Sequence, residues 1–416
     1  MGIAVLPQDL RRATVRVFSR LRTPQGQANP LPHYAELAAS GPVSPAPWGG
    51  HLVTGFAECD QVLRDRQWCE PDRRWRERQG RGTRWAAPSS QEMSHALPNL
   101  NGPEHARIRR AADGFDRAAI GRLLPVITTA TDRLLDTFHE QLRHGEADFA
   151  ALVGEELPIA TVGHWLGLPR ADWPRLRELT HDQVFTQELL PTASQLARSD
   201  AATVELRTYF TDLVRARRAR PGDDPVSQWI RTWDTLETDR DQADHQVYHL
   251  ARFVLLAALE TTATLLSQAV LHLVEHPLHW DAVAADPELV PGAVEESLRY
   301  DPPTHVISRV ASHDMRLAGR HIREGEMAHL LIGAAHHDPH RHADPATYNP
   351  HRNPGGHLAF SGGVHYCLGA PLVRLEAQTL ITQLTRRIPR PTLVRPPTWA
   401  PRVAFRRLLN LDLTLA

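Results

Sequence analysis

Hydrophobic side chains recur every three to four residues through the middle of the chain, which is the pattern of helices that bury one face. The segments with this pattern cover residues 104–118, 121–143, 147–166, 171–188, 198–218, 241–275 and 287–300. Short strand-like runs between turn residues cover residues 50–55, 305–331 and 395–415. The pattern predicts a mainly α protein with small β sheets. We expect one domain over residues 1–416, with a flexible N-terminal stretch over about residues 1–30.

The longest apolar stretch, from Val247 to Val274, is long enough to cross a membrane but carries polar side chains in its middle. Arg252 and Glu260 are among them, and charged groups are costly in lipid, so we expect a buried helix instead. Residues 1–40 are polar and contain several arginines, without the apolar segment of a signal peptide. These features predict a soluble protein with no membrane association.

The charge of the chain is balanced, with 47 basic and 48 acidic residues and a formal net charge of −1. Every basic residue is arginine. This balance argues against binding to nucleic acid or to an anionic membrane surface. The three cysteines, Cys59, Cys69 and Cys367, lack the spacing of a disulfide framework, which favours a reducing cytoplasm.

The stretch HLAFSGGVHYCLGAPLVRLE, residues 357–376, places Cys367 in a glycine-rich loop just before a helical pattern. Glycines allow a backbone to approach a flat ligand closely. A thiol at a helix N-terminus lies near the positive end of the helix dipole, which favours the thiolate, a nucleophile or metal ligand. Taken alone, a small buried core residue is the more common role of a cysteine.

The residues around Cys367 favour a metal ligand over a core residue. They fit the pattern Phe-x-x-Gly-x-His-x-Cys-x-Gly through Phe360, Gly363, His365, Cys367 and Gly369. The stretch resembles the haem-binding loop of cytochrome P450 enzymes. The resemblance implies that Cys367 is the axial ligand of the iron of haem b (iron protoporphyrin IX). Ser361 departs from the pattern, since many members of the family have glycine there.

Three further charged residues match the family. Glu296 and Arg299 stand three residues apart in EESLRY, a spacing that by itself is ordinary helix-surface electrostatics. In this position they are similar to the Glu-x-x-Arg motif of the family, and Arg352 resembles the third member of that group. The resemblance implies a structural triad that supports the long irregular loop from Asp338 to Gly356.

Haem propionates need cations or strong donors. The segment NGPEHARIRR resembles the corresponding family segment and supplies His105 and Arg109, which alone would be read as a solvated helix face. The resemblance assigns Arg309 and His365 to the other propionate-binding positions. A cofactor-binding set of His105, Arg109, Arg309 and His365 is therefore expected.

The segment LLAALETTATLL places an acid and two hydroxyls inside an apolar helix, where they are costly unless partnered or functional. A structural bend of the helix is the alternative, because threonine can bond a carbonyl one turn earlier. The family resemblance assigns Glu260 and Thr261 to proton delivery at the oxygen-binding side of haem. It places Ala258 against haem, where glycine is common in the family.

A histidine-rich segment, AAHHDPHRH, raises the possibility of a transition-metal site. His336, His337, His340 and His342 stand there with Asp338. The spacing fits no closed tetrahedral site, and Pro339 interrupts any helical pair. The segment resembles the family stretch that precedes the loop of Arg352, so we expect no metal site here.

The resemblance covers nearly the whole chain and implies the cytochrome P450 fold. It implies a monooxygenase that uses O2 and two external electrons to hydroxylate or epoxidise a small, largely apolar molecule, as in specialised-metabolite biosynthesis. Two alternatives stay open: oxidation without net oxygen insertion (aryl coupling, desaturation or nitrogen transfer), and a non-catalytic haem-binding sensor. A sensor has little need for the Glu260–Thr261 pair.

Partners follow from the same resemblance. Only 49 residues follow Cys367, so we expect no fused reductase but a separate ferredoxin or flavodoxin with an NAD(P)H-dependent reductase. Arg110 and Arg374 are candidates to guide an acidic partner to a monomeric enzyme. Substrate contacts are expected from residues 85–97 and 180–195 and from Leu255, Leu259 and Val306.

Overall fold

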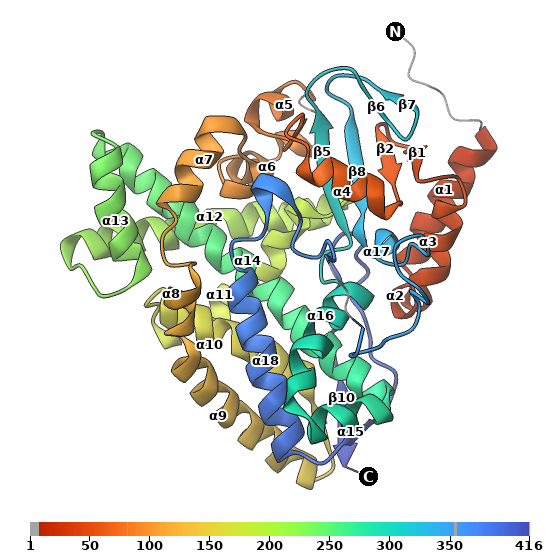
Figure 1. Ribbon diagram of the computed structural model, residues 1–416. Coiled ribbons are helices and arrows are strands. Elements are labelled where there is room, and N and C mark those ends of the chain that lie inside the picture. Colours follow the sequence, from red (N-terminus) through yellow and green to blue (C-terminus); the bar gives the residue numbers. More distant parts are fainter. Residues whose placement is uncertain (1–7, 81, 353–355, 416) are drawn as a thin grey trace.

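The computed structural model describes residues 8–80, 82–352 and 356–415. Helices form most of this part, and the largest sheet lies at one side, at the upper right of Figure 1. The helices are α1 (Gln8–Leu21), α2 (Pro24–Ala28), α3 (Leu31–Ala38), α4 (Phe56–Arg64), α5 (Arg73–Glu77), α6 (Pro88–Met93), α7 (Gly102–Ala111), α8 (Arg117–Gly121), α9 (Leu124–Arg143), α10 (Glu156–Trp165), α11 (Trp173–Gln183), α12 (Ala193–Ala219), α13 (Pro225–Leu236), α14 (Arg240–Glu275), α15 (Pro277–Ala285), α16 (Val290–Tyr300), α17 (Ile332–Ala335) and α18 (Ala370–Arg387). The predicted mainly α architecture is confirmed.

The strands of the described part form three small sheets. They are β1 (Val43–Pro45), β2 (His51–Val53), β3 (Trp68–Cys69), β4 (Glu146–Asp148), β5 (Val306–Ala311), β6 (Met315–Leu317), β7 (Arg320–Ile322), β8 (Met327–Leu331), β9 (Pro391–Leu393) and β10 (Asp412–Leu415). The largest sheet has the order β1-β2-β8-β5-β3, with β2 parallel and β5 antiparallel to β8. In this sheet Arg309 pairs with Ala328, so the arginine has a fixed position on a central strand.

Helix α14 crosses the middle of the molecule and organises the core on both sides (Figure 1). Its N-terminal half packs through Leu250, Leu255 and Leu259 into one hydrophobic cluster with α10–α13. Its C-terminal half packs through Leu265 and Val270 into a second cluster with α9 and α18. By length and composition α14 could cross a membrane, but 83% of its most apolar window is buried inside the protein. The prediction of a buried helix is confirmed.

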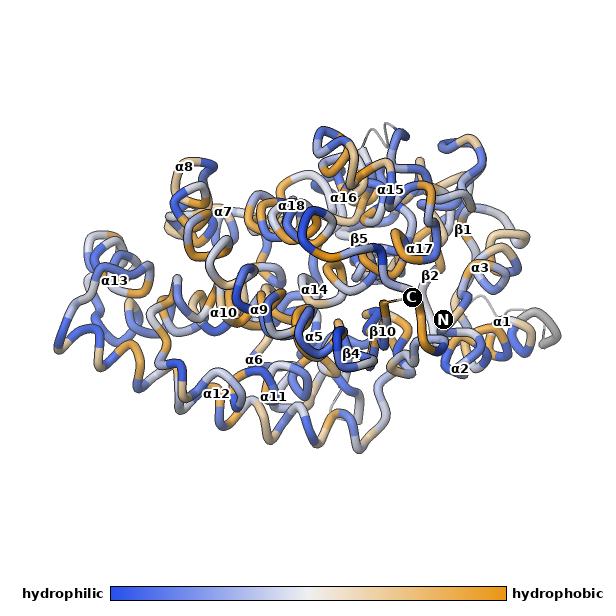
Figure 2. The backbone as a smooth tube through the Cα atoms, turned by 90° about the horizontal axis from the view of Figure 1, so that it is seen from below, coloured by the Kyte–Doolittle hydropathy of each residue, from blue (hydrophilic) through white to orange (hydrophobic). Residues whose placement is uncertain are grey.

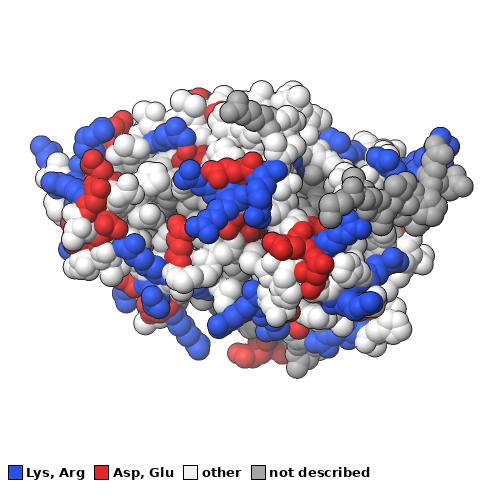
Figure 3. Space-filling model, turned by 90° about the horizontal axis from the view of Figure 1, so that it is seen from above, with Lys and Arg blue, Asp and Glu red and all other residues white. Residues whose placement is uncertain are grey.

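The outer layer shows the mixed surface expected from the composition. In Figure 2, α12 lies at the edge of the molecule, where hydrophilic and hydrophobic turns alternate along the tube. Figure 3 shows arginine and acidic side chains intermixed over one face of the molecule, in line with the net charge of −1. Neighbouring charges of opposite sign attract, so this face carries no extended field of one sign.

Two predicted helices are interrupted in the structure. The segment 104–118 becomes α7 and α8, because Gly114 adopts φ = +95° between them and Asp116 caps α8 by accepting from the backbone N–H of Ala118. The segment 147–166 begins with β4 and a π-helical turn, Ala150–Gly154, before α10. Local breaks of this kind depend on backbone angles that side-chain periodicity does not report.

Two other expectations need correction. The segment 395–415 was predicted as strand, but only β10 lies in it, because Pro396, Pro397 and Pro401 cannot donate to a sheet. Of the N-terminal stretch predicted to be flexible, residues 1–7 lie outside the described part, and α1 and α2 form the rest. Val17 and Phe18 are buried there because they pack against the sheet side of the molecule.

Candidate functional site

One cavity, of about 390 Å³, lies between α14 and the loop that carries the cysteine. Every residue predicted to hold the cofactor or move protons lines it: His105, Arg109, Ala258, Glu260, Thr261, Arg309, Phe360, His365, Cys367 and Gly369. These residues come from α7, α14, β5 and the segment before α18, which are far apart in the sequence. The fold therefore assembles one site from the separate motifs.

The cysteine loop has a fixed backbone conformation. The backbone N–H of Cys367 donates to the carbonyl of Phe360 over 2.9 Å. Gly363 has φ = +61°, and a Cβ at this position would lie 2.6 Å from the carbonyl oxygen of Leu63, so the position requires glycine. Ser361 also has a positive φ, +60°, which agrees with the glycine common at this position in the family.

The environment of the Cys367 thiol combines opposing effects. Burial raises its pKa, while the backbone N–H groups of Gly369 and Ala370 and the charges of Arg109 and Arg374 lower it. Burial prevails, so the pKa of the free thiol lies above its ordinary value. The N–H groups at the helix start therefore favour the thiolate as expected, and burial is the opposing effect that the sequence did not show.

Four nitrogen-bearing side chains meet at one end of the cavity. The rings of His105 and His365 have centroids 4.2 Å apart, and Arg309 lies 2.7 Å from Glu70, which is 4.0 Å from His365. Burial and the nearby arginines hold the pKa of His365 down to about 3, so the ring is a neutral donor or acceptor.

This donor set fits the carboxylates of a haem. Nε2 of His105 is buried with no hydrogen-bond partner in the described part of the chain, and such an atom is costly unless a ligand satisfies it. Arg109 donates to the carbonyl of Tyr366 over 2.7 Å, which leaves its other N–H groups for a ligand. With Cys367 on the same cavity wall, the residues can hold an iron porphyrin by its metal and its acidic groups.

Glu70 is a member of this end of the cavity that the sequence did not reveal. It follows β3, and its carboxylate forms an ion pair with Arg309, with 2.7 Å between Oε1 and Nη1. Burial raises the pKa of Glu70 to about 7, against the lowering effects of Arg309 and Arg76. No local pattern marks this acid, because its partner lies on β5, more than 200 residues further along the chain.

Two further arginines that the sequence did not single out also line the cavity. The guanidinium carbons of Arg76 and Arg84 lie 5.3 and 4.3 Å from the ring centroid of Trp85. Arg76 donates to neutral acceptors, among them Ser90 and Asn99. This wall therefore combines an aromatic surface with positive charge.

The face of α14 that borders the cavity differs from the predicted one. Val254, Ala257 and Thr261 line the cavity, whereas Leu255 and Leu259 are buried in the core on another face of the helix. Positions 254, 257, 258 and 261 follow the helical period and so lie on one face of α14. Val306 and parts of the segments 85–97 and 180–195 line the cavity as expected.

The acid–hydroxyl pair on α14 has two different environments. The hydroxyl of Thr261 donates to the carbonyl of Ala257 over 2.8 Å, as in the structural alternative that the sequence left open. Glu260 is almost fully buried, binds Arg402, and lies 2.6 Å from Nδ1 of His181. Both residues nevertheless line the cavity, so the pair can face a bound ligand.

The predicted triad forms a buried ion cluster. Arg299 makes two hydrogen bonds of 2.8 Å with Glu296, and both side chains are fully buried. Arg352 donates to the same carboxylate over 3.2 Å and to the carbonyls of Ala343 and Asp344. The cluster thereby connects α16 with the described part of the loop 338–356, of which residues 353–355 lie outside the description.

Histidines of the segment AAHHDPHRH form hydrogen bonds in the same region as the triad. His336 lies 2.9 Å from the carbonyl of Arg299 through Nδ1, and its Nε2 accepts from the backbone of Leu358 over 2.7 Å. His337 bonds the carbonyl of Gly333. These contacts tie the segment to α16 and to the start of the cysteine loop, and they occupy both ring nitrogens of His336 and Nδ1 of His337.

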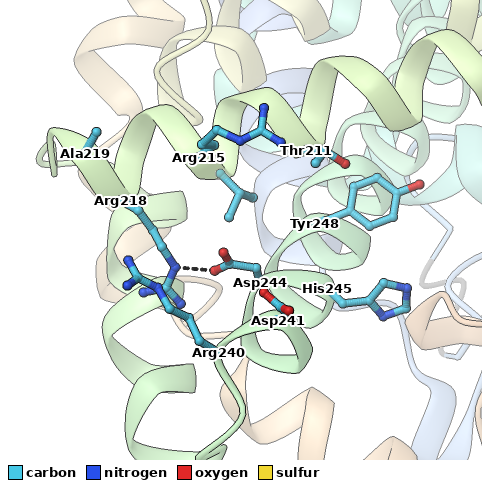
Figure 4. A pocket seen from close by; sticks show the side chains of 10 residues that line it. Thr211, Arg215, Arg218, Ala219, Arg240, Asp241, Asp244, His245 and Tyr248 are labelled. Atoms are coloured by element: carbon cyan, nitrogen blue, oxygen red, sulfur yellow. Dashed lines mark hydrogen bonds and ion pairs between the residues drawn. The ribbon is translucent and has the colours of Figure 1, made fainter.

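A second pocket, of about 590 Å³, lies at the surface between α12 and the start of α14 (Figure 4). Arg218 forms ion pairs there with Asp244 and Asp234, and His245 and Tyr248 complete the wall. The motif residues do not line this pocket. The chemistry therefore belongs to the interior cavity.

The chain is similar over most of its length to known proteins. The sequence profile described as "Cytochrome P450" matches residues 235–388. A biotin biosynthesis cytochrome P450 of Bacillus subtilis (strain 168) is 30% identical over 375 residues, 87% of this chain and 89% of that protein. Nocardicin C N-oxygenase of Nocardia uniformis subsp. tsuyamanensis is 32% identical over 377 residues, 89% of this chain and 91% of that protein.

Solved structures give the same result. The crystal structure of P450BioI in complex with an acyl carrier protein ligated to hexadec-9Z-enoic acid matches with a TM-score of 0.87 and 28% sequence identity. The match covers 94% of this chain and 99% of that one. Together with the cysteine loop and the cavity that it lines, these similarities show that the chain belongs to the cytochrome P450 family of haem-dependent monooxygenases.

Proposed function

We propose that the protein is a haem-thiolate monooxygenase that inserts one oxygen atom from O2 into a small, largely apolar molecule, by hydroxylation or epoxidation. The observation that carries this proposal is the convergence of Cys367, the four propionate-type donors and the Glu260–Thr261 pair on one cavity. Bound haem b would supply the oxidising chemistry. The protein residues hold the cofactor, shape the apolar wall and supply protons.

The roles of individual residues are part of the proposal. Cys367 would ligate the iron, and His105, Arg109, Arg309 and His365 would hold the propionates. Phe360, Ala258 and Gly369 would contact the macrocycle, and Glu260 with Thr261 would deliver protons at the opposite face. The triad of Glu296, Arg299 and Arg352 would support the cysteine loop from behind.

The cellular setting completes the proposal. We infer a single-domain, monomeric, cytoplasmic enzyme of specialised-metabolite biosynthesis. A polyketide biosynthesis cytochrome P450, PksS of Bacillus subtilis (strain 168), 28% identical over 92% of this chain, supports the biosynthetic role. A separate ferredoxin or flavodoxin with an NAD(P)H-dependent reductase would supply two electrons. Nucleic acid and membrane surfaces are no part of this function, in line with the balanced charge.

The first experiment tests the iron ligand. The ferrous protein with carbon monoxide is expected to show a thiolate-type Soret band, and Cys367→Ser is expected to lose it. A wild-type protein without this band would contradict the haem-thiolate assignment.

The second experiment tests the reaction. Candidate metabolites are screened by the spectral shift of the haem-loaded protein, and a compound that binds is then converted under ¹⁸O2 with surrogate redox partners. We expect one labelled oxygen in the product. A product without label would favour the alternative oxidation without oxygen insertion, and binding without any product would favour the sensor.

A further inference from the structure

His181 lies between two carboxylates at the edge of the cavity. Its Nδ1 is 2.6 Å from an oxygen of Glu260 on α14, and its Nε2 is 2.9 Å from an oxygen of Glu155, the residue before α10. His181 itself is on α11. Glu155, His181 and Glu260 thus form one row of titratable groups from three separate parts of the fold. The sequence could not reveal this row because 79 residues separate His181 from Glu260.

Two arginines of the C-terminal segment complete the surroundings of His181. Arg402 binds the other oxygen of Glu260 and donates to the carbonyl of His181 over 3.4 Å. Arg407 donates to Glu155 over 3.0 Å, and its Nη2 is also 3.0 Å from Nε2 of His181. Nε2 therefore has an acceptor for its proton, the carboxylate of Glu155, both in the charged ring and in the neutral ring that has released the proton of Nδ1.

The row leads from the cavity towards solvent. The Glu260 side chain is 3% exposed and lines the cavity, whereas His181 and Glu155 are 14% and 15% exposed. A proton that enters at the exposed end can reach Glu260 through consecutive hydrogen-bonded atoms. A purely structural ion cluster would not need a titratable ring as its central member.

The pKa values decide where the proton resides. Burial raises the pKa of Glu260, but Arg402 and His181 outweigh burial and hold it at about 2. Burial lowers the pKa of His181, but its hydrogen bonds to Glu155 and Glu260 raise it above the ordinary value. These effects favour a protonated imidazole beside the carboxylate of Glu260.

We propose that His181 is a positioning residue that stores the proton for the cavity and passes it to Glu260, a role that rests on the proposed function. One proton leaves Nδ1 of His181 for the nearer oxygen of Glu260, the imidazolium becomes a neutral imidazole, and the carboxylate becomes a carboxylic acid. Glu260 gives the proton to the cavity. The neutral ring keeps its proton on Nε2, and Nδ1 takes up a proton from solvent to restore the imidazolium.

The first test removes the proton that His181 can release but keeps a hydrogen-bond donor at this position. His181→Gln can still donate to Glu260 but cannot release a proton at neutral pH. We expect an unchanged ligand-induced spectral shift, a fall of about tenfold in product formed per NADPH consumed, and loss of the pH dependence of this ratio. A variant that keeps wild-type coupling and pH dependence would overturn the proposal, and so would one that loses the ligand-induced shift, because the role would then be structural.

The matched control is His51→Gln. His51 also pairs with a carboxylate, that of Glu326 at 3.1 Å, and its side chain is 11% exposed, but it does not line the cavity. We expect this variant to keep wild-type coupling and pH dependence. A loss equal to that of His181→Gln would show a general effect of histidine removal and overturn the assignment.

The second test does not use turnover. The ring of His181 is followed by ¹⁵N NMR of histidine-labelled protein, with His181→Gln for assignment. We expect the ring to titrate above the ordinary pKa of about 6.5 and Glu155→Gln to lower that pKa. A ring pKa at or below the ordinary value would overturn the proposal. Absence of product from the wild-type enzyme would contradict the proposed function but leave this titration unchanged.

Discussion

At the scale of single residues, Ser361 is the clearest departure from the family pattern. It adopts φ = +60°, a conformation that costs a residue with a Cβ about 1 kcal/mol or more relative to glycine. Its hydroxyl is 3.4 Å from Nη2 of Arg309, a weak contact with one of the propionate-type donors. The positive φ of Ser361 therefore destabilises the folded protein, whereas the contact with Arg309 stabilises it.

Two substitutions separate these effects. We expect Ser361→Gly to raise the free energy of unfolding by about 0.5–1 kcal/mol, because glycine relieves the strain. Ser361→Ala keeps the strain and loses the contact, so it should not stabilise the protein. Urea unfolding followed by tryptophan fluorescence measures both. A stabilising Ser361→Ala together with a destabilising Ser361→Gly would contradict this account.

Glu70 makes a second prediction at this scale, on pH. Its pKa is raised by burial from 4.5 to about 7, so between these values the folded protein keeps a proton that the unfolded chain has lost, and stability falls as pH rises. Glutamine does not ionise, so in Glu70→Gln this fall of stability with rising pH is absent. We expect the free energy of unfolding of the variant, relative to wild type, to increase by about 2 kcal/mol between about pH 5 and pH 8.

The control for Glu70 is an exposed acid nearby. Glu77 on α5 pairs with Arg73 across one helical turn, and its side chain is 53% exposed. Glu77→Gln should leave the stability difference from wild type flat over the same pH range. A flat curve for Glu70→Gln as well would show that burial does not hold a proton on Glu70.

At the scale of elements, α14 shows what the sequence could and could not predict. Its bounds, 240–275, agree with the expected 241–275 because the apolar pattern and its end signals are local. Its cavity face was assigned to Leu255 and Leu259, which instead fill the core. A helix that is apolar all round gives no sequence signal for which face meets a ligand, because both faces are buried.

The triad on α16 gives the prediction at this scale. Glu296 is fully buried against Arg299 and Arg352, so Glu296→Gln leaves buried guanidinium groups without a compensating charge. We expect a loss of about 3–5 kcal/mol in the free energy of unfolding. Heat- or urea-induced unfolding of the haem-loaded protein measures it.

The neighbouring acid on the same helix is the control. Glu295 pairs with Arg374 and His357 and is 25% exposed, so solvent can replace part of the lost contact. We expect Glu295→Gln to cost about 1 kcal/mol or less. Equal losses for the two variants would show that burial of the triad adds nothing to its stability.

At the scale of the whole molecule, the sequence motifs predicted the cavity better than they predicted its surroundings. Cys367, His105 and Arg309 belong to short recognisable patterns and line the cavity. His181 and Arg402 carry no such pattern, since their contacts form only when α11 and the C-terminal segment pack against α14. Long-range ion networks depend on tertiary packing, which neither periodicity nor motif spacing encodes.

Docking of an electron donor also belongs to this scale. Val364 and Tyr366 of the cysteine loop are exposed, so a partner can approach the loop from outside. Arg374 was expected to attract such a partner, but both of its donor nitrogens towards Glu295 are engaged, at 2.6 and 2.9 Å. Arg110 is exposed on α7, next to Arg109, which contacts Tyr366.

Arg110 is therefore the better test of an acidic redox partner. The net charge of −1 gives no overall attraction, so docking depends on local charges such as this one. We expect Arg110→Gln to lower the second-order rate constant for reduction by an acidic ferredoxin about threefold at low ionic strength, and the difference to vanish in about 0.5 M salt, where screening shortens the range of the field. Stopped-flow reduction measures the rate.

The control is Arg143, an exposed arginine at the end of α9 (Figure 1). Arg143→Gln should leave the rate constant for reduction unchanged. Equal slowing by both variants would mean that the partner responds to total charge and not to this surface.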